Sequence, residues 1–373
     1  MVHSTKPAHD FAGIFLEDAL KLMKDDVRRH RDKKLIWDKK DLAKALKNWE
    51  GYGYHEVFNI GKIQVELLDA GHILGSAIVK IKAEGKTIIF SGDLGNPPVP
   101  IIEDPEIIGK ADYVVMESTY GDRLHKKMGP REDSLREVFE EVYKKRGVLL
   151  IPAFAMERAQ ELIYEINDLI EHKGMQGLPV FLDSPLAIKA MEIYKKYPGY
   201  FDEEARKLIE KGDDVFDFLG LKITRTTAES KAINKVPQPK VIIAGSGMST
   251  GGRIIEHEKI YLPDSNNTIL FIGFQVKGTL GRKIKEGEKI VKIRGREVEV
   301  NAEIREIPGY SAHADQEGLL LWLKQMSSSD FTKPKKVFAV HGETPAAEAL
   351  ANKIKETYGI DSIAPKENDE FQL

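Results

Sequence analysis

The stretch Asp69-Ala70-Gly71-His72-Ile73-Leu74-Gly75-Ser76-Ala77 joins two segments in which apolar and polar residues alternate. The first segment is Lys62–Leu68 and the second is Ala77–Ile81. An alternation with a period of two residues is typical of a β-strand that has one buried face. The pattern therefore predicts two strands, with His72 closely following the first of them.

Polar residues also stand directly after three other apolar segments. Thr87–Phe90 ends at Ser91-Gly92-Asp93, Ala111–Met116 ends at Glu117, and Val337–Val340 ends at His341. Strand ends hold side chains in a fixed geometry, while the loops that follow them stay open to a ligand. Each of these residues alone is more typical of a structural or turn position. Four of them together favour a metal site, and on spacing alone both interpretations stay open.

The composition narrows the choice of ligands and the compartment. The 373 residues include no cysteine, so any metal must be held by His, Asp and Glu side chains. No apolar run approaches the ~18–20 residues that span a bilayer, and the N-terminus lacks the features of a secretion signal. We therefore expect a cytoplasmic protein with no membrane partner. The net charge of −3 neither favours nor excludes nucleic acid as a partner.

At ~150 residues for each domain, the length of the chain predicts two or three domains. In its middle third, the patterns of strands and helices alternate. Strands are expected at Gly147–Ile151, Leu178–Leu182, Val241–Ala244 and Thr268–Gly273, with helices at Glu157–Leu169 and Leu186–Lys196. Outside this region, helices are expected at Ala12–Lys24 and Gln316–Lys324, and β structure at Glu297–Ile307. Strands that alternate with helices predict an α/β sheet.

Eight segments, in order along the chain, resemble the motifs of metallo-β-lactamase/β-CASP ribonucleases of the polyadenylation-factor nuclease type. Two of them, Asp69–Ala77 and Ser91–Asp93, resemble the third and fourth metallo-β-lactamase motifs. Three others resemble motifs A, B and C of the family: Glu117–Gly121, Gly309–Asp315 and Val340–Glu343. Pro152–Glu161, Gly247–Arg253 and Phe274–Arg282 resemble further β-CASP segments. The resemblance implies an α/β fold: a metallo-β-lactamase αββα sandwich from residues 1–121 and 296–373, with an inserted α/β β-CASP domain at residues 122–295.

The same resemblance implies a metal site and a reaction. The family site holds two zinc ions that share a bridging carboxylate, and Asp93 matches that bridge. His72 matches a ligand of the first ion and His341 a ligand of the second. Neutral imidazole and carboxylate suit zinc, and two divalent ions neutralise charge on a phosphate during in-line attack. The implied activity is hydrolysis of RNA phosphodiester bonds, as in mRNA 3′-end processing or RNA decay.

Further roles follow from the resemblance. His313 matches the histidine that protonates the leaving 3′ oxygen, and Glu117 would orient that imidazole and favour its charged form. The residues expected to contact RNA are Ser184, Ser246, Gly247, Met248, Arg253 and Ser311. Backbone N–H groups of the glycine-rich turn, with Arg253 as a bidentate donor, would hold a phosphate. RNA is the expected partner, and a homodimer is an open alternative to a monomer.

One strong family signature, His-x-His-x-Asp-His, does not occur in the sequence. Because residues 2–10 resemble a segment that follows this motif in the family, we expect a family member without its N-terminal part and with impaired activity. A noncatalytic RNA-binding or scaffold member is the alternative function. A DNA nuclease is a second rival, and the histidine at position 341 favours RNA. The residues leave endonuclease and exonuclease action open.

Overall fold

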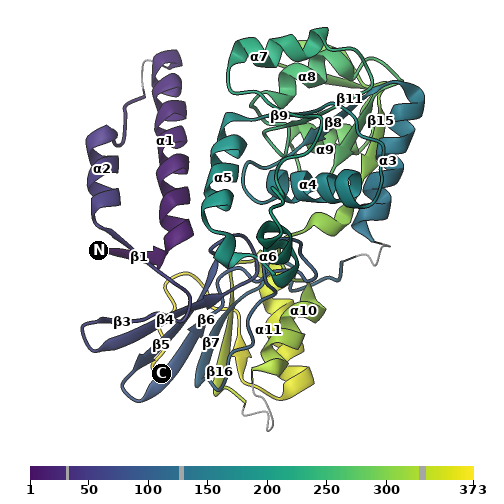
Figure 1. Cartoon of the computed structure of the whole chain (residues 1–373). Helices are drawn as coiled ribbons and strands as arrows, with labels where there is room; N and C mark the ends of the chain where they lie inside the picture. Colours follow the sequence, from purple (N-terminus) through teal and green to yellow (C-terminus); the bar gives the residue numbers. More distant parts are fainter. Residues whose placement is uncertain (31–32, 126–129, 327–332) are drawn as a thin grey trace. The chain divides into compact units, whose positions relative to one another are not determined.

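The computed structural model describes residues 1–30, 33–125, 130–326 and 333–373 (Figure 1). The chain forms two compact units, of which unit 1 comprises Met1–His125 and Ala312–Leu373, and unit 2 comprises Lys126–Ser311. The sequence placed the domain boundaries after residues 121 and 295. Unit 2 continues beyond residue 295 because strand β15 (Glu303–Glu306) pairs with β12 (Thr268–Phe271).

Unit 1 contains a seven-stranded sheet with the order β17-β16-β7-β6-β5-β4-β3. Its strands are β3 (Val57–Ile60), β4 (Ile63–Asp69), β5 (Ala77–Ala83), β6 (Lys86–Phe90), β7 (Tyr113–Glu117), β16 (Lys336–Val340) and β17 (Ser362–Ile363). β4 and β6 are both antiparallel to β5, whereas β6, β7 and β16 are parallel neighbours. Strands β4, β6, β7 and β16 therefore all run in the same direction and end at the same edge of the sheet.

The alternation along β4 explains how the strand packs on both faces. Val65 and Leu67 pack with Phe58 of β3 on one face, whereas Leu68 belongs to the large core on the other. That core includes buried residues of α10 (Gln316–Gln325) and α11 (Thr344–Tyr358), which cover this face of the sheet. The predicted strands at Lys62–Leu68 and Ala77–Ile81 are thus confirmed, within one or two residues at their ends.

The N-terminal residues of unit 1 form a second, smaller sheet and two helices. The elements are β1 (Val2–Thr5), α1 (Lys6–Arg29), α2 (Lys39–Lys47) and β2 (Trp49–Tyr52), and β1 pairs in parallel with β2. The helix predicted at Ala12–Lys24 is the middle of the longer α1, which begins after the N-cap Thr5. The Thr5 hydroxyl also donates to the Gly75 carbonyl at 2.6 Å, which ties the start of the chain to the loop that carries His72.

Unit 2 contains a parallel six-stranded sheet with the order β10-β9-β11-β8-β12-β15. Its remaining strands are β8 (Val148–Pro152), β9 (Val180–Asp183), β10 (Leu221–Ile223) and β11 (Lys240–Ala244). Its helices are α3 (Arg131–Lys145), α4 (Arg158–Asn167), α5 (Pro185–Lys196), α6 (Glu203–Glu210), α7 (Thr227–Ala232), α8 (Ile254–Tyr261) and α9 (Leu280–Lys285). Strands β8, β9, β11 and β12 are buried along their whole length, as expected of a parallel sheet with both faces covered.

A short antiparallel hairpin completes unit 2. It pairs β13 (Ile290–Ile293) with β14 (Arg296–Glu299), and it was not predicted as a separate element. In both units together, no helix within the described ranges is long and apolar enough to cross a membrane. The α/β fold class that the sequence predicts is confirmed by this arrangement of strands and helices.

One buried carboxyl in unit 2 gives the fold a pH dependence. The Glu258 side chain lies on α8 with none of its surface exposed, and it accepts a hydrogen bond from the Ser249 hydroxyl. Its other oxygen, Oε2, has no hydrogen-bond partner. Burial raises the pKa of Glu258 from its ordinary value of 4.5 to about 7, because the charged form loses its hydration.

We predict that Glu258→Gln makes the stability of the protein less sensitive to pH. The folded state binds the Glu258 proton more tightly than the unfolded state, so this group favours folding below its unfolded pKa. That contribution is lost as the pH rises through about 7. The difference in pKa corresponds to roughly 3 kcal/mol. Urea unfolding at pH 5 and pH 8 measures the effect, and an equal pH dependence in wild type and Glu258→Gln would contradict it.

Candidate metal centre

The candidate metal ligands lie at one edge of the unit 1 sheet. His72 follows β4, Asp93 follows β6, Glu117 is the last residue of β7, and His341 follows β16. Because these four strands run in the same direction, their carboxyl ends meet at that edge. Polar residues at such strand ends are the usual positions for ligand binding in α/β sheets.

A close approach of two glycines brings the His72 and Asp93 loops together. The backbone N–H of Gly95 donates to the Ala70 carbonyl at 2.9 Å. A Cβ atom on Gly95 would lie 1.8 Å from the carbonyl oxygen of Gly71, which is far inside any van der Waals contact. Gly71 itself has a φ of 61°, in the left-handed region that glycine adopts without a steric penalty. Both positions therefore require glycine for the two loops to meet.

The two oxygens of Asp93 face different histidines. Asp93 Oδ2 lies 3.9 Å from His72 Nε2, and Asp93 Oδ1 lies 3.3 Å from His341 Nε2. The Asp93 side chain is 37% exposed and that of His341 is 62% exposed, so a ligand can reach both. One oxygen directed towards each imidazole is the arrangement that a bridging carboxylate requires. The structure thus brings together the three residues that the sequence predicts as metal ligands.

The imidazole of His72 is held by its other nitrogen. Its Nδ1 lies 3.2 Å from the Ala312 carbonyl oxygen. A carbonyl accepts only, so Nδ1 carries the proton, and the lone pair is left on Nε2, the atom that faces Asp93. Metal-binding histidines commonly donate their second N–H to a carbonyl or carboxylate in this way. The side chain of His72 is only 12% exposed, which restricts its rotation further.

The turn that carries His341 is fixed to the neighbouring strand. Ser118 donates its hydroxyl to the Val340 carbonyl at 2.7 Å, and Thr119 donates to the His341 carbonyl at 3.1 Å. His341 has a φ of 55°, which is unusual for a residue other than glycine. Two hydroxyls hold this strained backbone, so the Cα–Cβ bond of His341 keeps its direction.

His313 reaches the same edge through its own backbone contacts. Gly95 and His313 form an antiparallel bridge, and the Ala314 N–H donates to the Leu94 carbonyl at 2.9 Å. His313 Nδ1 lies 3.2 Å from Glu117 Oε1. The buried Glu117 carboxylate also accepts from the Leu94 N–H at 2.6 Å, so it is fixed. His313 does not cap the helix that follows it, because Asp315 caps α10 by accepting from the Gly318 N–H.

The donor set fits a zinc ion. Zinc–nitrogen and zinc–oxygen bonds of ~2.0–2.2 Å place two ligand atoms of one ion ~3.3–3.6 Å apart, close to the Asp93–His341 separation of 3.3 Å. Within the described residues, His72, Asp93 and His313 also form a group whose ligand atoms lie within 4.8 Å of one another. Geometry alone therefore permits His313 to be a ligand, and its predicted role as the acid stays a prediction.

Of the residues expected to bind RNA, Ser184 follows β9, and Ser246, Gly247 and Met248 follow β11, at the carboxyl ends of unit 2 strands. Ser184 caps α5 by accepting from the Ala187 N–H, and the Ser246 hydroxyl accepts from the Thr250 N–H at 2.9 Å. Gly247 is buried and Met248 is half-buried in the turn after β11, and Ser311 is half-buried at the end of unit 2. The placement of these residues does not show whether they bind RNA, so their role in RNA binding stays a prediction.

The contacts of Arg253 differ from its predicted role as a hydrogen-bond donor to a phosphate. Its Nη1 donates to Asp183 Oδ1 at 2.7 Å and to the Thr224 carbonyl, and its Nη2 donates to the Arg225 carbonyl. Hydrogen bonds from His257, Ser230, Thr224 and Arg253 to the buried Asp183 together hold its pKa at about 2, despite its burial. The guanidinium is thus already paired inside the protein, and this arrangement favours a structural role for Arg253.

Comparisons with known proteins match two family models and several curated relatives. Residues 159–284 match the family model of the Beta-Casp domain, and residues 297–365 match that of the Zn-dependent metallo-hydrolase RNA specificity domain. The chain is 36% identical to a ribonuclease of Thermus thermophilus, over 94% of this chain and 77% of that protein. It is 30% identical to the transcription termination factor FttA of Thermococcus kodakarensis, over 100% of this chain but only 58% of that protein.

Two further matches extend the comparison. An RNase J-like protein of Methanocaldococcus jannaschii is 29% identical, over 98% of this chain and 81% of that protein. A crystal structure of a protein of unknown function from Enterococcus faecalis superposes with a TM-score of 0.51 at 11% identity, over 98% of this chain and 74% of that one. The latter supports the fold alone.

We predict that Gly95→Ala weakens the metal centre. The added methyl group would overlap the Gly71 carbonyl, so the Asp93 loop must move away from the His72 loop at a cost of about 1–3 kcal/mol. Zinc affinity measured with a competing chelator should fall, together with the melting temperature. Gly109→Ala serves as the control, because a Cβ at Gly109 meets no atom within 4 Å. Unchanged zinc affinity in Gly95→Ala would show that this contact does not position the ligands.

Proposed function

The chain belongs to the metallo-β-lactamase β-CASP ribonuclease family, and from this premise we propose that it hydrolyses RNA phosphodiester bonds in a zinc-dependent reaction. The observation that carries the proposal is the placement of Asp93 between two imidazoles, one facing each of its oxygens. The names of its relatives, which include a ribonuclease and an RNase J-like protein, support RNA as the substrate.

The residues that would hold zinc are His72, Asp93 and His341. When bound there, zinc supplies positive charge that activates water and offsets the negative charge developing on the phosphate. The protein's own contribution is to present the ligand atoms ready for binding. The Ala312 carbonyl fixes the ring of His72, and the Ser118 and Thr119 hydroxyls fix the turn of His341.

His313 is proposed to supply the proton that the leaving group needs. Hydrolysis forms a bond between a water oxygen and phosphorus and breaks the bond from phosphorus to the 3′ oxygen, which must then be protonated. Glu117 accepts the Nδ1–H of His313, so the imidazole presents Nε2 as the atom that transfers the proton. Because Glu117 is only 1% exposed and is anchored by the Leu94 N–H, the ring stays in this orientation.

The affinity for zinc follows from the ligands that the described residues offer. With Asp93 as the bridge, His72 and Asp93 would hold one ion, and Asp93 and His341 would hold the other. Each ion would then have two protein ligands, whereas a catalytic zinc site usually has three. We therefore propose that this chain binds zinc weakly and that its RNA cleavage is slow.

The proposed function is tested by removing and restoring zinc. The protein is stripped with a chelator, reloaded, and assayed for zinc per chain and for cleavage of labelled RNA. We expect incomplete zinc binding at low free zinc, and RNA cleavage that rises with the zinc content, with both strongly reduced in His72→Ala. His30→Ala is the matched control, since His30 is an exposed histidine of unit 1 outside the site. Zinc binding without cleavage at any zinc concentration would instead support a noncatalytic RNA-binding member.

We further predict that His313→Ala lowers RNA cleavage by about 10²–10⁴-fold, the usual contribution of a general acid, while zinc content stays near that of wild type. Activity and zinc per chain are measured on the same sample. Loss of zinc together with activity would identify His313 as a ligand, as its distance from His72 and Asp93 permits.

A further inference from the structure

Unit 2 concentrates positive charge in one short segment. Residues 277–296 contain eight lysines and arginines and two glutamates, whereas the whole chain has a net charge of −3. The segment includes α9, β13 and the first residue of β14. A local excess of cations in an otherwise acidic chain is the electrostatic signature of a surface that binds a polyanion.

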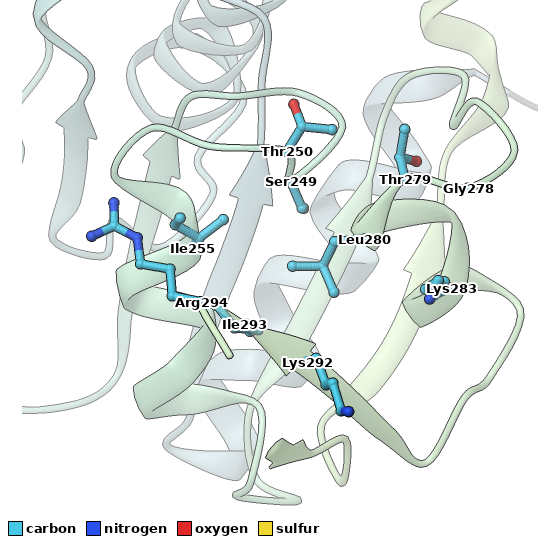
Figure 2. Close-up of a pocket in the computed structure, with 10 residues that line it drawn as sticks. All are labelled: Ser249, Thr250, Ile255, Gly278, Thr279, Leu280, Lys283, Lys292, Ile293 and Arg294. Atoms are coloured by element: carbon cyan, nitrogen blue, oxygen red, sulfur yellow. The ribbon is translucent and has the colours of Figure 1, made fainter. Parts of the chain in front are cut away.

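These residues surround a pocket of about 330 Å³ (Figure 2). In Figure 2, Ser249 and Thr250, from the loop after β11, lie on one side of the pocket, and the cationic residues Lys283, Lys292 and Arg294 lie around the remaining sides. Ile255, Leu280 and Ile293 also line the pocket and give it an apolar part. The pocket thus combines an apolar lining with a cationic rim, which suits a molecule that has both a flat apolar group and a negative charge.

The hydroxyl groups at the pocket are already used within the protein. Ser249 donates to Glu258, and Thr279 donates to the Val276 carbonyl at 2.7 Å. Thr250 Oγ1 lies 3.1 Å from the Ser246 hydroxyl. The side chains able to bind a new anion are therefore the cations.

The charges of two lysines are not neutralised by the protein. Arg294 pairs with Glu256 at 3.0 Å, but Lys283 and Lys292 have no acidic partner within 4 Å in the part of the chain that the structure describes. Both lysines are exposed. Lys277, Lys289 and Arg296 lie in the same segment outside the pocket. They are also exposed and have no acidic partner within 4 Å among the described residues. A free nucleotide would need only the pocket, whereas charges that continue beyond it suit a chain of several phosphates.

We propose that this surface, formed by residues 277–296 and the pocket, binds single-stranded RNA. Lys283 and Lys292 contact phosphates, and one nucleotide packs its base or ribose on the half-buried Leu280. The inference rests on the proposed function in one respect, the choice of RNA as the polyanion. It adds an RNA-binding surface to unit 2, whereas the metal centre is in unit 1.

The test compares two double variants of equal charge. Lys283→Ala/Lys292→Ala removes both cations of the pocket. Lys211→Ala/Lys235→Ala removes two other exposed lysines of unit 2, which do not line the pocket. Binding of a fluorescein-labelled oligouridine is measured by anisotropy over a range of salt concentrations, with a chelator present to prevent cleavage. Melting temperatures establish that each variant is folded.

The pocket variant should bind oligouridine on the order of tenfold more weakly than wild type at low salt. Its slope of log affinity against log salt should be shallower by about 1.4, since each phosphate contact to a single strand contributes about 0.7. The control variant should keep the wild-type affinity within about twofold. Wild-type affinity and slope in the pocket variant, or no oligouridine binding by the wild type, would overturn the inference.

The outcome is separable from that of the proposed function. If the zinc-loaded chain does not cleave RNA but the pocket variant loses binding, the RNA-binding surface stands and the ribonuclease proposal fails. If the chain cleaves RNA and the pocket variant binds it normally, the ribonuclease proposal stands and the RNA-binding surface fails.

Discussion

The arrangement of the candidate metal ligands depends on the contact between the backbones at Gly71 and Gly95. A Cβ at residue 95 would lie 1.8 Å from the Gly71 carbonyl oxygen, so only two glycines allow the loops after β4 and β6 to approach this closely. The approach sets the position of His72 relative to Asp93. It also sets the position of His313, because Gly95 forms the bridge to that residue. Every other feature of the site refines an arrangement that this contact makes possible.

The histidines at the site are positioned by groups that are not themselves proposed to bind the metal. The Ala312 carbonyl fixes the tautomer of His72, Glu117 does so for His313, and the Ser118 hydroxyl holds the turn before His341. Ala312 lies more than two hundred residues beyond His72 in the sequence, and the two ends of unit 1 must therefore fold together before the site exists. Preorganised ligands lower the cost of binding a metal and of reaching the transition state.

The placement of the candidate site residues could largely be predicted from the sequence, because His72, Asp93, Glu117 and His341 follow apolar strands and stand in recognisable motifs. The contribution of the Ala312 carbonyl could not, since a backbone carbonyl has the same chemistry at every residue and only tertiary structure selects one. Arg253 was expected to bind phosphate because its motif is glycine-rich. Its three internal hydrogen bonds depend on Asp183 and on the residues after β10, which no local pattern connects to it. Strand β13 of the hairpin was missed for a different reason: its charged neighbours hide the alternation of Val291 and Ile293, which pack into the unit 2 core.

The central claim is that His72, Asp93 and His341 hold the metal and that His313 does not. Nitrogen-15 chemical shifts of the imidazole rings test it most directly, in protein labelled at histidine and titrated with zinc, with resonances assigned by single substitutions. The account predicts that the Nε2 resonances of His72 and His341 move to the values of metal-bound nitrogen on addition of zinc, whereas His313 retains the pattern of a ring hydrogen-bonded through Nδ1. Metal-bound shifts at His313, or none at His72 and His341, would contradict it.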